Sequence, residues 1–177
     1  MFMKKVSVRL LTVAGATALA LGVTSGTQAG TATANLTVQA TVTSNCTITT
    51  TAVDFGNYDP IVANASAALD APAGGKITLV CSNGASAKVT LSQGANPDTG
   101  STAAAPARRL KHGTDYLQYT LYSDAGKQDV WGDTAGTGLA HTGTGAQADL
   151  DVYGTVPGGQ NVPVGTYTDT VLATVTF

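Results

Sequence analysis

Residues 166–177 constrain the fold of this chain most strongly, because their side chains alternate in character. Threonine occupies most positions of one parity. The other parity is apolar or aromatic apart from Asp169, and it carries Tyr167, Val171, Ala173, Val175 and Phe177. Such alternation predicts a half-buried β-strand. No later segment of the sequence could cover this strand, and an open apolar edge templates association. We therefore expect another chain segment to pair with it.

The opening of the chain has the composition of a secretory signal peptide. A basic start is followed by an apolar run over residues 10–23 and by small residues ending at Ala29. We therefore expect a signal peptide over residues 1–29, with cleavage after Ala34 as the alternative. The apolar run is short for a membrane span of about 20 residues, so we expect no membrane span after cleavage.

Composition bounds the rest of the chain. Of 177 residues, nine are Lys or Arg and eleven are acidic, and every acidic residue is an aspartate. Removing the signal peptide makes the remainder more acidic, which leaves no basic patch for nucleic acid. Abundant Thr, Ala, Gly and Val favour extracellular β-structure over helix. The length suits one domain with a sizeable core, which we place at residues 44–177.

The two cysteines, Cys46 and Cys81, both survive the predicted cleavage. An even pair behind a signal peptide predicts a disulfide. A metal site is the alternative, but His112 and His141 stand apart from the cysteines and from each other. We therefore expect neither a metal nor a cofactor.

Several further segments predict strands. Alternation over residues 34–48 is long for one strand, since strands usually have about 5–6 residues, and a break near Ser44 would divide it. Further strands are expected at residues 76–81, 87–91, 116–122 and 150–156, with a short one at 130–131. Arg108, Arg109 and Lys111 are expected at a solvated loop end. Short strands separated by turn signals predict an all-β sandwich.

The sequence argues against an enzyme. Without glutamate, paired-carboxylate chemistry would need aspartates, and Asp149 and Asp151 simply share one polar strand face. No serine stands in a nucleophile-elbow context. The loop around Trp131 remains a candidate contact surface if the protein is an adhesive binding module.

Motifs spread along the chain resemble those of the spore coat protein U family, which includes the major subunits of archaic chaperone–usher pili. Each motif alone is weak, but the ordered set ending in Gly-x-Tyr-x-Asp-Thr is fairly specific. The matching segments are residues 45–48, 55–58, 75–81, 109–110, 117–122, 153–157 and 165–177.

The resemblance implies an incomplete immunoglobulin-like sandwich that lacks its last strand and polymerises by strand addition. An N-terminal extension, residues 30–43, would donate Leu36, Val38, Ala40 and Val42. The acceptor groove would be formed by Val171, Ala173, Val175 and Phe177. Alternation cannot by itself distinguish this donor from the chain's own first strand.

The partners implied by the resemblance are other copies of the chain, head to tail, together with a periplasmic chaperone and an outer-membrane usher. The protein would pass through the periplasm to the cell surface and support adhesion or biofilm formation as a pilus subunit. The alternative is a secreted spore or cell coat protein, or an adhesive binding module.

Overall fold

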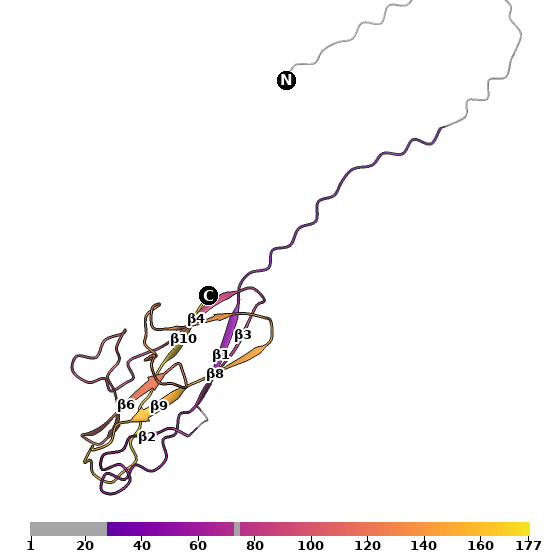
Figure 1. The fold of residues 1–177 in the computed structure, drawn as a ribbon. Coiled ribbons are helices and arrows are strands. Elements are labelled where there is room, and N and C mark those ends of the chain that lie inside the picture. The colour runs from indigo at the N-terminus through magenta and orange to yellow at the C-terminus, as the bar shows by residue number, and fades with distance from the viewer. Residues whose placement is uncertain (1–27, 73–74) are drawn as a thin grey trace, which may run out of the picture. The chain divides into compact units, whose positions relative to one another are not determined.

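The computed structural model describes residues 28–72 and 75–177. Nearly all of the predicted signal peptide lies outside these residues. Within them, no helix has the length and apolar character needed to cross a membrane. Residues 28–40 belong to a separate unit from Thr41–Phe177 and form neither helix nor strand. The domain that follows is built of β-strands and loops (Figure 1).

The strands are short and follow one another through turns. They are β1 (Cys46–Thr51), β2 (Leu69–Asp70), β3 (Lys76–Cys81), β4 (Ser86–Leu91), β5 (Arg108–His112), β6 (Asp115–Tyr122), β7 (Leu139–Thr142), β8 (Gln147–Asp151), β9 (Tyr153–Val156) and β10 (Ala173–Thr176).

These strands form three sheets around a main hydrophobic core and a small second cluster of Cys81, Ala85 and Ala87. The sheet orders are β1-β3-β8, β10-β4-β7 and β2-β9-β6-β5, and every pairing between strands is antiparallel. Alternate residues of β3, β4 and β6 are buried. The core contains Ile77, Leu79, Val89, Leu91, Leu117, Tyr119, Leu121, Trp131, Val152 and Val156.

Strong alternation located the central strands correctly. The predictions at residues 76–81, 87–91 and 116–122 are confirmed by β3, β4 and β6. The single strand predicted at residues 150–156 is wrong, because the chain passes at Val152 from β8 into β9 of a different sheet. Three short strands without clear alternation, β2, β5 and β7, were not predicted, and Val130 makes only an isolated bridge to Tyr122.

The last strand is shorter than its alternation predicts. Only β10 is a strand within residues 166–177, and Thr168 forms an isolated bridge to Lys111. The segment between them is held by the side chain of Asp169, which accepts a hydrogen bond from the amide of Ala95 (2.9 Å). This contact ties the segment to the loop that follows β4, and the ladder with β4 itself starts at Ala173.

Candidate functional site

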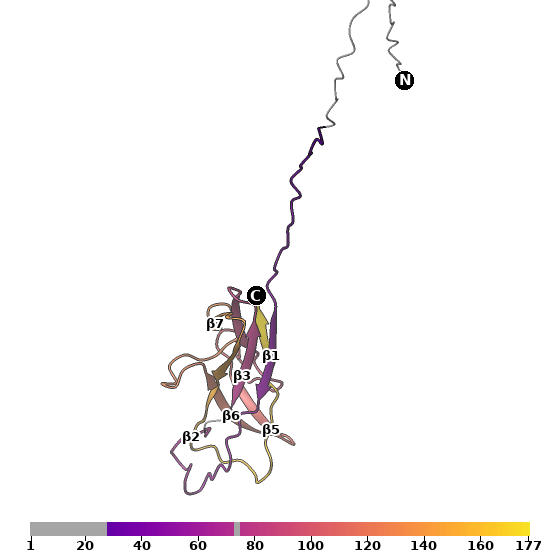
Figure 2. The same ribbon diagram turned by 90° about the vertical axis from the view of Figure 1, so that its right-hand side faces the viewer.

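The first and last strands of the domain each have one paired edge and one free edge within the described chain. β1 pairs with β3, and β10 pairs with β4. The two strands lie side by side without pairing to each other (Figure 2). Two rows of backbone donors and acceptors therefore flank a gap in the sandwich.

A hollow of about 360 Å³ occupies this gap. Its walls come from Thr50 and Thr51 of β1 and from Val171 and Ala173 beside and within β10. Its floor is the core itself, formed by Ile77, Leu91, Tyr119, Leu121 and Val152. The gap thus opens directly onto side chains that a complete sandwich would cover with one more strand.

A second hollow, of about 460 Å³, continues the first. The two share Val53, Phe55 and Leu110 in their walls, so together they form one groove. The second hollow ends among two loops, at residues 54–60 and 162–167. Phe55 meets Tyr119 edge to ring, with centroids 5.9 Å apart, and lines both hollows.

Gly154 makes room for this wall. A Cβ atom at position 154 would stand 2.9 Å from the ring of Phe55, closer than real Cβ atoms come to their neighbours. A larger residue at position 154 would force this ring to move. The glycine therefore allows the ring of Phe55 to lie where it lines the groove.

The predicted acceptor residues take different positions along β10. Val171 and Ala173 line the first hollow. Val175 is half-buried and packs against the disulfide and its neighbouring alanines, at the other end of the strand. Phe177 lines neither hollow and is 51% exposed.

The predicted donor residues are exposed. Residues 28–43 run as an extended segment (Figure 1), in which Leu36, Val38 and Val42 are 87%, 86% and 90% exposed. The break predicted near Ser44 coincides with the start of β1 at Cys46.

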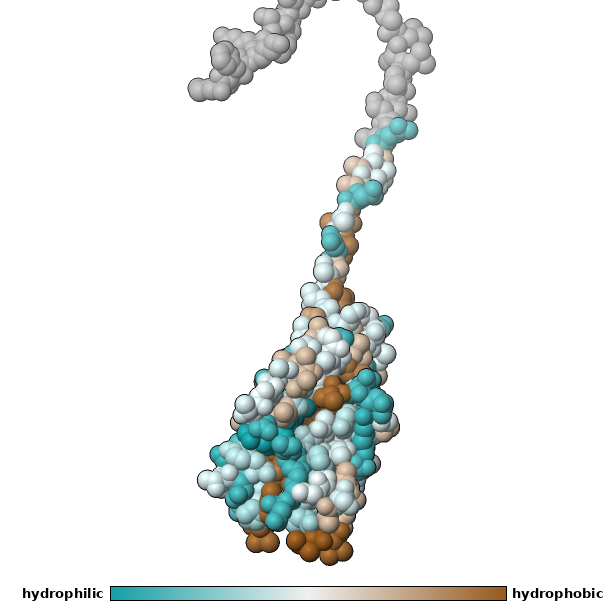
Figure 3. Space-filling view, turned by 60° about the vertical axis from the view of Figure 1, so that its left-hand side comes forward, coloured by the Kyte–Doolittle hydropathy of each residue, from teal (hydrophilic) through white to brown (hydrophobic). Residues whose placement is uncertain are grey.

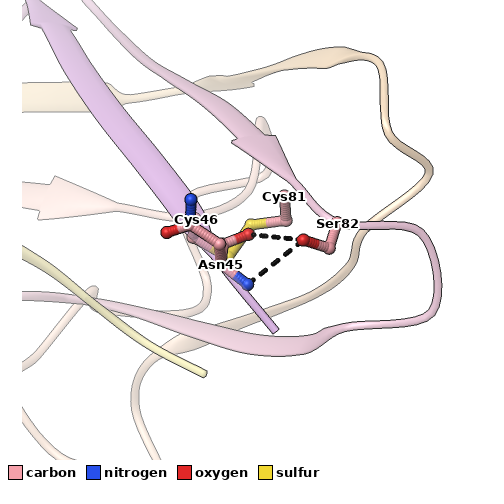
Figure 4. Close-up of a disulfide and its surroundings, with 4 residues drawn as sticks. All are labelled: Asn45, Cys46, Cys81 and Ser82. Atoms are coloured by element: carbon pink, nitrogen blue, oxygen red, sulfur yellow. Dashed lines mark hydrogen bonds between the residues drawn. A yellow bond between two sulfur atoms is a disulfide. The ribbon is translucent and has the colours of Figure 1, made fainter. Parts of the chain in front are cut away.

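A disulfide joins Cys46 at the start of β1 to Cys81 at the end of β3. Ser82 reinforces the junction: its Oγ accepts a hydrogen bond from the amide of Asn45 (3.2 Å) and donates one to the carbonyl of the same residue (3.3 Å) (Figure 4). The first residue before β1 is therefore fixed to the domain, two residues after the end of the predicted donor segment.

Trp131 and Arg108 are buried, although the sequence predicted both in exposed loops. Trp131 is fully buried, and its indole Nε1 donates to the carbonyl of Val89 (2.9 Å), so it is no contact surface. Arg108 is 1% exposed rather than at a solvated loop end. Its guanidinium donates to the carbonyls of Leu91, Ser92 and Trp131. Arg108 and Leu110 of β5 pair with Tyr119 and Leu117 of β6.

No chemistry-bearing cluster accompanies the groove. Among the residues that the structure describes, no group of three His, Cys or Asp side chains is placed to hold a metal ion. The groove offers apolar side chains and free strand edges, which bind an extended peptide segment by adding it to a sheet.

The geometry defines an immunoglobulin-like β-sandwich with an open groove between two strand edges. Solved structures of this fold are similar to it. One is a CsuC–CsuE chaperone–tip adhesion subunit pre-assembly complex from the archaic chaperone–usher Csu pili of Acinetobacter baumannii, at a TM-score of 0.52 and 24% identity. The match covers 77% of this chain and 40% of that chain.

Two further structures match at a TM-score of 0.50 and 19% identity. The P pilus rod subunit PapA matches over 74% of this chain and 97% of its own. A chain in the structure of a chaperone–usher pilus matches over 88% of this chain and 99% of its own length.

The chain belongs to the Spore Coat Protein U domain family, whose sequence profile matches residues 32–174. Protein U of Myxococcus xanthus is 47% identical to it over 156 residues, which cover 85% of this chain and 87% of that protein.

Proposed function

We propose that this chain is the structural subunit of a secreted surface fibre, an archaic chaperone–usher pilus that supports adhesion or biofilm formation. One observation carries the proposal: the groove between the free edges of β1 and β10 has the hydrophobic core as its floor. Leaving such a floor in water is unfavourable, and free strand edges invite pairing. The groove therefore calls for an apolar strand.

The N-terminal extension, residues 30–43, has the pattern of that strand. Its apolar side chains Leu36, Val38, Ala40 and Val42 alternate with polar ones, so a single strand face would enter the groove. Burying each of the three larger side chains contributes roughly 1.5–3 kcal/mol, and alanine contributes less. Pairing to the free edge of β10 would fix the register, because a slip by one residue turns threonine toward the core.

Donation from one copy to the next produces a fibre. The donor segment and the groove are different surfaces, so the contact is heterologous and head to tail, and it propagates as an open filament. Val171 and Ala173 line the groove. Val175 lies within β10, and Phe177 follows the strand.

Export needs a temporary occupant for the groove. The predicted signal peptide would direct the chain to the periplasm, where a chaperone would cover the groove until the next subunit arrives at an outer-membrane usher. One similar structure is a complex of a chaperone with a subunit, which supports this order of events. Domain boundaries at residues 29 and 43 follow from the same proposal.

A secreted coat protein is the second candidate, and the family's description favours it. Strand donation would serve a coat equally well, since both are assemblies of one chain. The adhesive-module alternative loses its main support, because Trp131 lies in the core.

The test substitutes one residue of the donor segment in the full chain. Val38→Asp would bring a carboxylate into the apolar groove, so we expect SDS-resistant oligomers and fibres to disappear. Unheated denaturing gels measure the oligomers, and electron microscopy of cells shows fibres or a coat layer. Thr37→Asp is the matched control, because its side chain would face away from the groove.

Loss of assembly in both variants would indicate an effect of charge rather than of groove filling. Unchanged assembly in Val38→Asp would contradict donation by this segment. A continuous layer in place of protruding fibres would identify the coat alternative.

A further inference from the structure

Three large apolar side chains stand exposed where the groove ends among loops. Ile61 is 74%, Val62 is 78% and Val164 is 97% exposed. Val164 and Pro60, which precedes Ile61, both line the second hollow. Figure 3 shows hydrophobic residues gathered at this lower end of the domain, formed by the loops below β2 in Figure 1. We call these three residues the loop-end patch.

Hydrogen bonds hold the loop of Ile61 and Val62 in place. The carboxylate Oδ1 of Asp59 accepts from the amides of Ile61 (2.9 Å) and Val62 (3.1 Å). Asn64, which is 5% exposed, accepts from the amide of Asp59 (3.0 Å) and donates to the carbonyl of Ala67 (3.2 Å). The loop is therefore built to present two apolar side chains outward.

The direction in which the donor segment of another copy pairs with β10 determines which part of that copy lies near the loop-end patch. Every strand pairing in the described domain is antiparallel. An added strand that continues this pattern on β10 runs from Phe177 toward Val171. Its residue 43 then leaves the groove at the loop end, beside Pro60 and Val164.

The connection from that point to the next domain is short. Only residues 43–45 separate Val42 from Cys46, the first residue of β1. The four steps from Val42 to Cys46 reach about 14 Å at most when extended. Asn45 is also tied to Ser82, so the connection cannot lengthen by peeling from its own domain without losing these bonds. The Cys46 end of the donating copy must therefore lie against the loop end of the accepting copy.

We propose that the loop-end patch is the contact surface for the Cys46 end of the next copy in the fibre. This inference rests on the proposed function. The Cys46 end offers an apolar complement, because Phe177 follows β10 there and is 51% exposed. The contact would fix the angle between successive subunits, which strand donation alone leaves free.

Thiol accessibility in assembled fibres tests the contact. Both native cysteines are joined in the disulfide, so a cysteine introduced into the full chain is the one free thiol. The test variant is Val164→Cys. The controls are Val80→Cys, 39% exposed on the outer face of β3, and Ala135→Cys in an exposed loop. A maleimide reagent of high mass reports each reaction as a gel shift.

In the isolated subunit structure Val164 is more exposed than Val80, so an uncovered patch predicts faster modification at position 164. A covered patch predicts the reverse, with modification of Val164→Cys in fibres about tenfold slower than of both controls, since access limits thiol reactions. Equal rates are expected for all three variants after unfolding in guanidinium.

Fibres in which Val164→Cys reacts as fast as Ala135→Cys would overturn the inference and leave the proposed function standing. If the unmodified chain and every variant form no assembly, the proposed function fails and this inference fails with it.

Discussion

The hydroxyl of Tyr119 donates a 2.7 Å hydrogen bond to Oδ2 of Asp169, joining the centre of β6 to the segment before β10. The other carboxylate oxygen accepts from the side-chain amide of Asn96 (3.0 Å) as well as from the backbone at Ala95. Burial, together with the bond to Asp169, raises the pKa of Tyr119, so the phenol stays a donor across the ordinary pH range. Asp169, the one polar exception in the alternating C-terminal segment, is an anchor beside the groove.

Tyr119→Phe should destabilise the domain. The substitution removes a partly buried hydrogen bond to a carboxylate, and such bonds contribute about 1.5–3 kcal/mol. The measurement is the free energy of unfolding of the full chain in urea. Tyr116→Phe is the matched control, because the hydroxyl of Tyr116 makes no hydrogen bond within the described residues and its ring stays over Arg109. Equal losses in the two variants would contradict the anchoring role.

Replacing Cys46 and Cys81 by alanine should lower the free energy of unfolding by about 4 kcal/mol in the chain-entropy description. The cysteines are 35 residues apart, and the disulfide closes β1 against β3 at the start of the domain. Guanidinium unfolding of the unmodified chain and of the double alanine variant provides the comparison. Ser82→Ala is the control that removes only the neighbouring hydroxyl. A double variant as stable as the unmodified chain would refute this expectation.

Arg108→Lys should cost about 3 kcal/mol although it keeps the positive charge. The guanidinium donates to the carbonyls of Ser92 (2.8 Å), Leu91 (2.9 Å) and Trp131 (2.8 Å), and a single ammonium cannot reproduce that planar fork. Arg109→Lys is the control, since Arg109 is partly exposed and pairs with Asp98 (2.9 Å). Thermal unfolding should separate the two, and equal melting temperatures would count against the buried fork.

The loop that presents Ile61 and Val62 should loosen in acid. Hydrogen bonds from the amide of Ile61, and then of Val62, lower the pKa of Asp59 from 3.8. A carboxylate with a depressed pKa in the folded state contributes stability that is present above pH 3.8 and lost as pH falls through the folded value. The amide shifts of both residues, followed by NMR, should therefore titrate with a midpoint below 3.8.

Asp59→Asn keeps an acceptor oxygen and should abolish this titration. A midpoint at or above the ordinary value of an aspartate, or an unchanged titration in Asp59→Asn, would show that the carboxylate does not hold the loop.

Segments in which apolar and polar residues alternate strongly were predicted as strands from the sequence. Ile77, Leu79 and Cys81 share a parity and are all buried, so β3 was predictable to its ends. Arg108 shows the limit of this approach. A basic residue after a Gly- and Pro-rich loop is usually solvated, and only the three carbonyls that surround it explain its place in the core.

The candidate groove shows the same limit. Period-two alternation predicted that Val171 and Ala173 share an apolar strand face, and the family resemblance implied that this face lines a groove. The opposite wall at Thr50 and Thr51, the shared ring of Phe55 and the loop end at Val164 were not predictable. They are far apart in the chain, and no local pattern records which strand edges stay unpaired.

The sequence alone therefore determined the β-class, the central strands and two alternating segments. Residues 166–177 predict a strand without a cover, and residues 34–43 have the pattern of a strand able to cover one. Those properties follow from local periodicity, which each segment carries by itself. Only the tertiary structure decided that the last strand starts at Ala173, that Arg108 is buried and that the groove runs from β10 to the loop end. These depend on contacts between distant residues, whose free energy arises only when the sheets have packed.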